Sequence, residues 1–253
     1  MSASRLALAA LAALVALVGC NNANEPTFQG WIEAELIFVG PDEAGRVQTL
    51  SVSQGDQVAL RQPLFTLDTE LQTADVAMQE AAVKNAQQAY DRARQLLKTQ
   101  AGTQKTLDDA EAALRTAQAR LNSAQTRLAR RQVLSPVAGS VQQVYYRAGE
   151  LVSAGKPILA LLPPGNLKVR FFVKEAELPK LKYGDTVSVS CDGCGDGILA
   201  KISFISRSSE FTPPVIYSLE ERSKLVFMIE ARPDEPERLR VGQPVSVVLG
   251  PAR

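Results

Sequence analysis

The sequence predicts an elongated α+β chain of several domains: a small β-sandwich, a long antiparallel α-helical coiled-coil hairpin inserted into it, and a β-rich region behind it. The first observation behind this prediction is a β unit that occurs twice in the chain. The second is the stretch between the two copies, which holds no Pro and one Gly and is dense in strong helix formers. The third is a heptad pattern of Leu and Ala in the second half of that stretch.

The composition is that of an ordinary globular protein without histidine. The 253 residues are 45% hydrophobic and 22% charged, and 28 Lys and Arg stand against 27 Asp and Glu. This balance gives no overall field that would attract nucleic acid, although a local charged patch stays possible. The absence of His removes the usual general base near neutral pH and the commonest metal ligand. Most hydrolase and metalloenzyme mechanisms therefore lack their central residue, and we expect no metal site and no nucleic-acid partner.

The N-terminal segment predicts export and lipidation. Its apolar run over residues 6–18 is shorter than the ~20 residues that a helix needs to cross a bilayer, and it is typical of a signal peptide. The run ends in Leu17-Val18-Gly19-Cys20, which resembles a bacterial lipobox. This predicts a signal peptide over 1–19, an acylated Cys20 and a lipidated tether over 20–29. The alternative is an ordinary secretory signal in which the cysteine stands by chance.

The repeated β unit predicts the sandwich. Its copies lie in residues 45–68 and 135–162. The landmarks Gly45, Gly55 and Pro63 recur at a constant offset as Gly139, Gly149 and Pro157. Each copy predicts a strand, a Gly turn before an acidic residue, a short strand and a Pro-led apolar strand. One copy cannot bury both faces of so short a sheet, so we expect the two copies to pair.

Residues 69–134 predict the helical hairpin. The predicted seam of its second half repeats every seven residues, with Leu107, Leu114, Leu121 and Leu128 interleaved by Ala110, Ala117 and Ala124. The predicted seam of its first half is looser and consists of Leu71, Ala74, Met78, Ala81, Ala82, Ala86, Ala89, Ala93 and Leu96. Residues 99–103 supply the turn, and Thr106 with Asp109 predicts the cap of the returning helix. The polar outer positions by themselves indicate only a solvated surface.

The two remaining cysteines, Cys191 and Cys194, stand in Cys-Asp-Gly-Cys between the strand-like stretches 186–190 and 198–202. In an exported chain, two cysteines around a Gly-containing turn favour a local disulfide. A redox-active pair is the alternative, although such a pair is expected to open a helix after a strand. A zinc site would need four ligands, and this motif offers two.

Taken together, these segments resemble the HlyD-type membrane fusion proteins, the periplasmic adaptors of tripartite exporters. The resemblance rests on two lipoyl-like half-motifs, the hairpin between them, the return through residues 134–139 and the trailing β region. It implies a lipoyl-like domain over 45–68 and 135–162, and a β-barrel domain over 30–44 and 163–250. The lysine-bearing turn of lipoyl domains is replaced here by the hairpin, so no lipoate or biotin is expected.

Two stretches resemble partner-contacting parts of that family. Residues 210–227 are similar to a segment of adaptors that work with ABC-type transporters; the alternative is a Pro-stiffened barrel loop without a partner. At the hairpin tip, Arg92, Leu96 and Thr103 match the Arg-x3-Leu-x6-Ser spacing of adaptors that meet a TolC-like outer-membrane channel, with Thr in place of Ser. The resemblance implies that these three residues contact the channel.

The function implied by this resemblance is that of a non-enzymatic lipoprotein adaptor. It would link an inner-membrane exporter of ABC type to a TolC-like outer-membrane channel for efflux or secretion, as a homo-oligomer, a hexamer. The chain is expected on the periplasmic side of the envelope, in the inner rather than the outer membrane, although Asn21 stands where enteric inner-membrane lipoproteins often carry Asp. The alternatives are a coiled-coil envelope scaffold without a transport role and a redox lipoprotein that uses Cys191 and Cys194.

Overall fold

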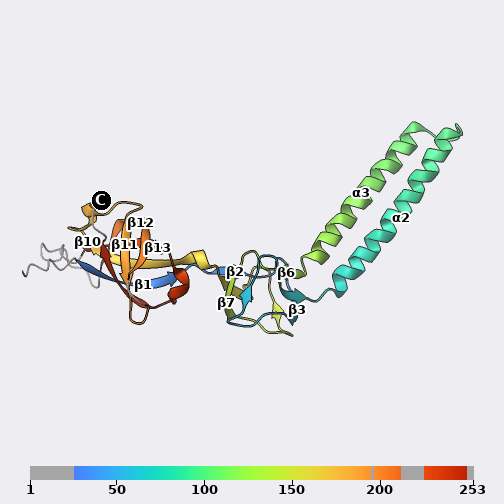
Figure 1. Cartoon of the computed structure of the whole chain (residues 1–253). Coiled ribbons are helices and arrows are strands. Elements are labelled where there is room, and N and C mark those ends of the chain that lie inside the picture. The colour runs from blue at the N-terminus through green and yellow to red at the C-terminus, as the bar shows by residue number, and fades with distance from the viewer. Residues whose placement is uncertain (1–25, 195–196, 212–224, 250–253) are drawn as a thin grey trace, which may run out of the picture. The chain divides into compact units, whose positions relative to one another are not determined.

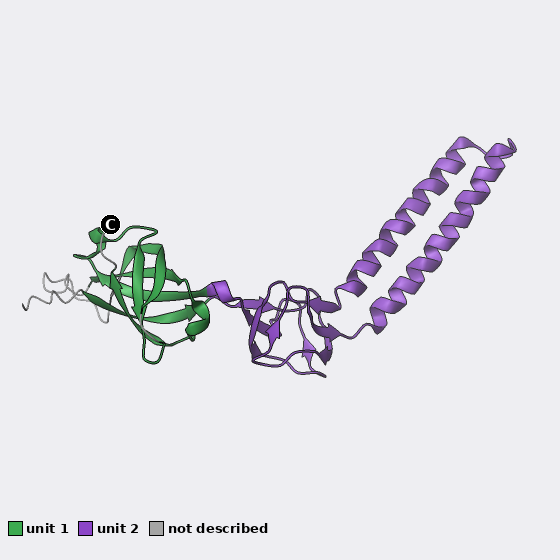
Figure 2. Cartoon of the chain, viewed as in Figure 1, with its two compact units in different colours: residues 1–34, 167–253 green, residues 35–166 purple. Residues whose placement is uncertain are grey.

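The computed structural model describes residues 26–194, 197–211 and 225–249, and the chain divides into two compact units (Figures 1 and 2). Unit 1 combines residues 1–34 with residues 167–253, and unit 2 consists of residues 35–166. Cys20, the predicted signal peptide and most of the segment compared with ABC-associated adaptors lie outside the described residues.

Unit 1 contains a closed barrel of six antiparallel strands in the order β1-β10-β13-β12-β11-β14. The strands are β1 (Thr27–Ala34), β10 (Leu167–Lys174), β11 (Thr186–Ser190), β12 (Ile198–Phe211), β13 (Leu225–Pro233) and β14 (Pro244–Leu249). Side chains alternate between the two faces of a strand, and in β10 the alternate residues from Leu167 to Val173 are buried in the barrel interior. The β-rich tail of the sequence therefore closes on itself with the help of one N-terminal strand.

Unit 2 holds two four-stranded sheets and two long helices. One sheet has the order β2-β9-β7-β4 and the other β6-β5-β3-β8. The strands are β2 (Ile37–Val39), β3 (Gly45–Leu50), β4 (Gln57–Val58), β5 (Pro63–Leu67), β6 (Gln132–Leu134), β7 (Gly139–Val144), β8 (Leu151–Val152) and β9 (Leu159–Leu162). The predicted pairing of the two copies into a sandwich is confirmed.

The two copies of the β unit exchange their short strands. Gly45 of the first copy pairs with Val152 of the second, and Gly139 of the second pairs with Val58 of the first, which is the equivalent contact. The turn glycines Gly55 and Gly149 both have φ of 95°, a left-handed conformation that favours glycine. Each sheet is therefore completed by the other copy, which explains why one copy is insufficient.

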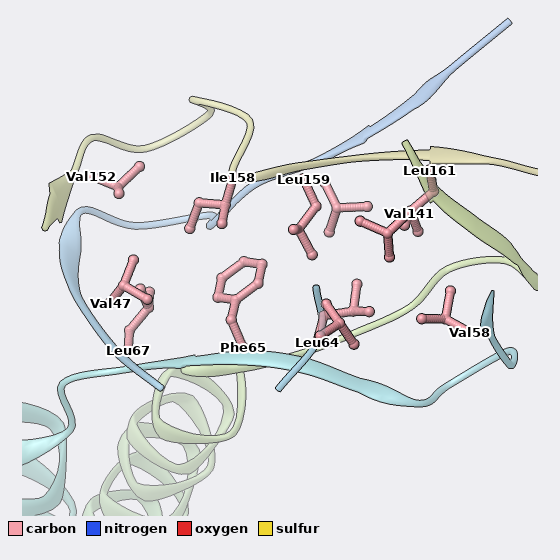
Figure 3. Packing of buried hydrophobic residues seen from close by; sticks show 12 residues of the cluster. Val47, Val58, Leu64, Phe65, Leu67, Val141, Val152, Ile158, Leu159 and Leu161 are labelled. Carbon is pink, nitrogen blue, oxygen red and sulfur yellow. The ribbon is translucent and has the colours of Figure 1, made fainter. Parts of the chain in front are cut away.

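Residues from both copies fill the space between the sheets. Figure 3 shows Phe65 in the middle of this space, with Leu64 and Leu67 of the first copy and Leu159 and Leu161 of the second around it. All five side chains are fully buried. Burial of apolar surface contributes about 25 cal/mol per Å2 and is the main stabilising contribution to so small a sandwich.

Two helices are inserted between the copies: α2 (Glu70–Lys98) and α3 (Gln104–Ala129). They run side by side in Figure 1, and the guanidinium of Arg127 on α3 lies 2.7 Å from the carboxylate of Asp75 on α2. All seven predicted seam residues of α3 are buried or half-buried, which agrees with the heptad pattern. Among the described residues, no helix is long and apolar enough to cross a membrane.

The predicted seam of α2 is wrong in its first half. Leu71 and Met78 are 79% and 62% exposed, and Ala74, Ala81 and Ala82 are also exposed. The face toward α3 is formed instead by Gln72, Val76, Gln79, Val83, Ala86, Tyr90, Ala93 and Leu97, all of which are half-buried or buried. This face also keeps the predicted 3-4 spacing. The observed face stays apolar along the rest of the helix, through Tyr90 to Leu97, whereas the other stripe continues at the same spacing into the polar Asn85, Gln88 and Arg92.

Domain boundaries also differ from the predicted ones. Residues 27–29 begin the barrel strand β1 rather than ending a tether, and residues 35–44 belong to unit 2 and supply β2. Strand β6 (Gln132–Leu134) belongs to the sandwich rather than to the hairpin, because it pairs with β5. The backbone hydrogen bonds that each segment finds decide its domain, and these partners are distant in the sequence.

Candidate functional site

The tip of the helix pair is a tight turn held by its own backbone. Helix α2 ends at Lys98, where the amides of Ala101 and Gly102 donate to the carbonyl of Leu96. Gln100 has φ of 59°. A Cβ at Gly102 would lie 3.1 Å from the Cβ of Leu96, so the turn passes close over this leucine. The tip is therefore a defined surface with Leu96 beside the turn.

All three predicted channel contacts, Arg92, Leu96 and Thr103, are exposed in the structure. Leu96 is 48% exposed, and Arg92, one turn earlier on the same face, is exposed as well. The neighbour Leu97, by contrast, is half-buried in the interface with α3. An exposed leucine beside a rigid turn is a candidate apolar anchor for a partner.

Thr103 has a structural task at the same turn. It is the N-cap residue of α3, and its Oγ1 accepts a hydrogen bond from the amide of Thr106 at 3.2 Å. The hydroxyl groups of the two threonines also lie 2.7 Å apart. The predicted cap formed by Thr106 and Asp109 is therefore wrong by one turn, and Asp109 pairs with Lys105 instead. A Thr or Ser is favoured here because its oxygen satisfies a free amide of the helix end.

The outward face of α2 carries an apolar stripe, which we call the outer stripe: Leu71, Ala74, Met78 and Ala81. Its four side chains share the 3-4 spacing of a second heptad seam, yet all four are exposed. Exposed Leu and Met in a regular stripe are a candidate interaction surface. Sequence analysis detected these residues but assigned them to the wrong partner, since it placed them against α3.

A buried arginine ties the end of α3 to the sandwich. The side chain of Arg131 is only 8% exposed, and its Nη1 donates to the carbonyl of Ala44 at 2.9 Å. Glu43 and Asp68 lie 3.4 and 3.9 Å from the guanidinium. With the Gln72 amide turned so that its oxygen faces Arg131, that oxygen accepts from Nε at 3.1 Å.

The glycine of the first half-motif makes room for this arginine. A Cβ at Gly45 would lie 2.5 Å from Nη1 of Arg131 and 2.8 Å from a carboxylate oxygen of Asp68. Sequence analysis missed Arg131 because a single arginine in a basic, helix-rich stretch carries no local signal. Only the recurrence of this glycine in both copies, as Gly45 and Gly139, could have suggested that another group packs closely against it.

The outer surface of the barrel carries a four-charge cluster: Glu33, Lys168, Arg170 and Glu230. The carboxylate of Glu230 lies 2.8 Å from both Lys168 and Arg170, and Arg170 lies 2.6 Å from Glu33. Burial alone would raise the pKa of Glu230, but the hydrogen bonds and charges of Lys168 and Arg170 outweigh it, so the pKa is lowered. The cluster joins β1, β10 and β13 and has the character of a structural network.

Cys191 and Cys194 lie in a turn that connects β11 to β12, and the structure joins them by a disulfide. The turn is also held by Arg238, whose Nη2 donates to the carbonyl of Cys194 at 2.6 Å. Among the described residues, no group of three or more Cys, Asp or Glu is placed to hold a metal ion. The tip and the outer stripe are thus the candidate functional surfaces of unit 2.

Comparison with known proteins identifies the family. The model of the RND membrane fusion protein barrel-sandwich hybrid domain matches residues 35–162, half of the chain. The chain belongs to the membrane fusion protein family. These proteins are periplasmic adaptors of the RND/HlyD type and are generally not enzymes. The matched family model is that of RND-type membrane fusion proteins. The match therefore does not confirm the ABC-type exporter that the sequence resemblance implies.

Solved membrane fusion proteins share the fold. A MacA–MexA chimera that contains the Pseudomonas aeruginosa MexA α-hairpin domain has a TM-score of 0.73 at 21% identity, over 90% of this chain and 81% of that one. The membrane fusion protein Spr0693 of Streptococcus pneumoniae R6 has a TM-score of 0.70 at 20% identity, over 90% of this chain and 100% of that one. At these identities the likeness concerns the fold.

Curated relatives match only part of their own length. A UPF0194 membrane protein of Acidithiobacillus ferridurans is 30% identical over 118 residues, which are 46% of this chain and 35% of that protein. A UPF0194 membrane protein of Yersinia pseudotuberculosis is 32% identical over 117 residues, 46% of this chain and 36% of that protein. The chain thus matches little more than a third of the length of these relatives.

Proposed function

We propose that this membrane fusion protein is an efflux or secretion adaptor that links an inner-membrane exporter to a TolC-like outer-membrane channel. The observation that carries the proposal is the match of residues 35–162 to the family, in which α2 and α3 leave the sandwich between its two half-motifs and end in an exposed tip. The adaptor hydrolyses nothing itself; the exporter supplies the energy. An ABC-type exporter is favoured by the likeness of residues 210–227 to ABC-associated adaptors.

The helix pair acts as a coiled-coil hairpin whose tip meets the channel. Leu96 is the apolar anchor, because it is exposed and is not needed for packing against α3. Arg92 supplies a positive charge one turn away on the same face. Thr103 contributes chiefly by capping α3 and holding the turn, since its hydroxyl is already engaged with Thr106.

Several copies assemble side by side, and we propose a hexamer. The outer stripe supports this step, because an exposed Leu and Met at seam spacing gain contact area when they pack on another helix. The exposed face of α3 offers small residues at similar spacing for such packing: Ala112, Thr116, Ala119, Ser123 and Thr126. A head-to-tail contact of α2 on α3 between copies closes into a ring when the rotation permits.

The lipid anchor is proposed from the lipobox and would hold the chain at the periplasmic face of the inner membrane. The thiol of Cys20 is the acyl acceptor, so Cys20→Ala should abolish incorporation of a fatty-acid probe in cells. Labelling of the Cys20→Ala protein at the wild-type level would refute the anchor. The proposed adaptor could still work as a non-acylated exported protein.

An export assay tests the adaptor role, and substitutions at two neighbouring leucines test the tip contact. A deletion strain should accumulate dye, and wild-type protein should restore export. Leu96→Asp should fail to restore export, because docking would bury an unpaired carboxylate at a cost of several kcal/mol, against about 1.4 kcal/mol for each tenfold change in affinity. Cross-linking to the channel should be lost while helicity and melting stay near wild type.

Leu97→Asp is the matched control, because it places the same charge against α3 and should lower the melting temperature. Full export by Leu96→Asp would refute the proposed contact between the tip and the channel. Normal export in the deletion strain together with a weakened envelope would refute the adaptor and favour an envelope scaffold.

A further inference from the structure

At each end of the barrel, three strands begin and the other three end. Neighbouring strands are antiparallel, so β1, β11 and β13 begin where β10, β12 and β14 end. We call this the Thr27 end. It also carries the connection from β10 to β11, residues 175–185. Ala34 and Leu167, at which the chain passes to and from unit 2, lie at the opposite end of their strands.

The proposed anchor limits how far the Thr27 end can lie from a bilayer. Cys20 and Thr27 are separated by seven peptide units, which span at most about 25 Å when fully extended. If Cys20 is acylated, as proposed above, the first barrel strand starts within that distance of the headgroups. Any lipid contact of the barrel therefore involves this end first.

The Thr27 end presents an apolar hollow of about 630 Å3. Its apolar lining comes from Leu178, Tyr183, Phe204, Ile205 and Phe227. Tyr183 is 77% exposed and Phe204 is 45% exposed. An exposed tyrosine is typical of the boundary between water and a membrane, where its ring is apolar and its hydroxyl stays hydrated, and the ring of Phe204 adds apolar area.

Basic side chains surround this hollow. Lys174, Lys180, Lys182 and Arg207 are exposed at the same end of the barrel. Three acidic residues lie in the same connection, of which Glu177 pairs with Lys180 at 2.7 Å and Asp185 accepts from the Lys182 amide at 2.7 Å. The third is Glu175. Glu210, close to the end of β12, balances the fourth basic residue, so the charges are matched in number. Exposed Lys182 and Arg207 stand next to the aromatic lining, and basic side chains beside an apolar hollow match the chemistry of anionic phospholipid, with acyl chains beneath charged headgroups.

We propose that the Thr27 end is a lipid-contact surface that seats the barrel on an anionic bilayer. Tyr183 and Phe204 enter the headgroup boundary, and Lys182 and Arg207 bind the phosphates. The short tether and the basic side chains beside the aromatic lining favour a membrane over a protein partner as the occupant. The surface adds a second, weaker attachment to the single lipid anchor, which suits stable membrane association by two signals.

The test uses the mature chain, residues 20–253, with Cys20→Ser so that no acyl chain contributes. Binding is measured by flotation with phosphatidylcholine vesicles that either contain or lack phosphatidylglycerol. We expect at least tenfold stronger partitioning onto the anionic vesicles, decreasing with added salt. Lys182→Glu/Arg207→Glu should lower that partitioning at least tenfold, since each basic residue near the surface contributes about fivefold. Tyr183→Ser should lower it severalfold.

Matched controls lie at the opposite end of the barrel. Arg232→Glu/Arg240→Glu makes the same charge change on exposed residues, and Leu199→Ser removes a side chain that is 48% exposed. Both should bind as the unsubstituted Cys20→Ser chain does. All these positions are exposed, and circular dichroism should report an intact fold in each variant.

Three outcomes would overturn the lipid-contact surface. The first is that the chain binds neither kind of vesicle, and the second is that the test and control pairs lose binding equally. The third is that a photo-cross-linker at position 183 captures a protein and no lipid in cells. These results are independent of the export assay: vesicle binding with normal export in the deletion strain would leave the surface standing and refute the adaptor.

Discussion

Replacing Arg131 by Met should destabilise unit 2, because this residue joins the base of the helix pair to the sandwich. Met keeps much of the volume of the buried stem but removes every hydrogen bond of the guanidinium. The carbonyl of Ala44 loses its donor, and the Gln72 amide loses the partner that holds it. The substitution leaves the backbone hydrogen bond from the Leu67 amide to the Arg131 carbonyl in place.

The expected loss follows from the burial of each contact. The hydrogen bond to Ala44 is donated by a charged group that is 8% exposed, and such a bond contributes roughly 1.5 to 3 kcal/mol. Glu43 and Asp68 are half exposed, so water screens each ion pair to below about 1 kcal/mol. Packing of the methionine offsets part of the loss. We expect the free energy of unfolding of unit 2 to fall by about 2 to 3 kcal/mol.

The chain provides separate signals for its two units. Both long helices lie in unit 2, so ellipticity at 222 nm follows that unit, whereas the single Trp, Trp31, lies in β1 of unit 1. In urea titrations, Arg131→Met should shift the ellipticity transition and leave the fluorescence transition unchanged. Arg130→Met is the matched control: its ion pair with Asp42 is exposed, and the expected change is below about 0.5 kcal/mol.

A double-mutant cycle with Gly45 sharpens this test. Gly45→Ala should destabilise the wild-type protein, because the added methyl would lie against Nη1 of Arg131. The cost should change by at least about 0.5 kcal/mol in the Arg131→Met background, since contacting residues are energetically coupled. Equal effects of Arg130→Met and Arg131→Met, or strictly additive Gly45 and Arg131 substitutions, would refute the reasoning.

Three further predictions concern the disulfide, the outer stripe and the barrel charges. Replacing Cys191 and Cys194 by Ser should lower the stability of unit 1 by no more than about 2 kcal/mol, because the closed loop is so short, and export should survive; loss of export from a normally folded double variant would point to a functional thiol pair. Met78→Glu should weaken self-association at least tenfold in sedimentation experiments while helicity is retained; Gln118→Glu, an exposed residue of α3, is the control, and equal effects of the two would exclude the outer stripe. Glu230 has a lowered pKa in the folded state, so its stabilising contribution is present above the ordinary value of 4.5 and is lost as the pH falls through the lower folded value; stability of Glu230→Gln measured between pH 3 and 6 should lack this acid-side loss, and curves of identical slope would contradict the assignment.

The sequence by itself determined the sandwich and the positions of the helices. Two copies of a β unit with glycines at equivalent turns, Gly55 and Gly149, specify strands too short to be stable alone, so their pairing follows from the repeat. The helix formers between the copies specify α2 and α3, and the Leu and Ala heptad of α3 specifies its buried face. These features are local, because propensity and periodicity are written in neighbouring residues.

Only the tertiary structure decided the face of α2 and the tasks of Thr103 and Arg131. Two stripes of α2 share the same 3-4 spacing, one containing Leu71 and Met78 and the other containing Val76 and Val83. Apolar content favours the first only near the start of the helix; the second continues into Tyr90 and Leu97, and packing against α3 along the full length buries it. The rotation of a helix, the cap at a tight turn and the partner of a buried arginine depend on groups distant in the sequence, and they are settled only when those groups meet in the fold.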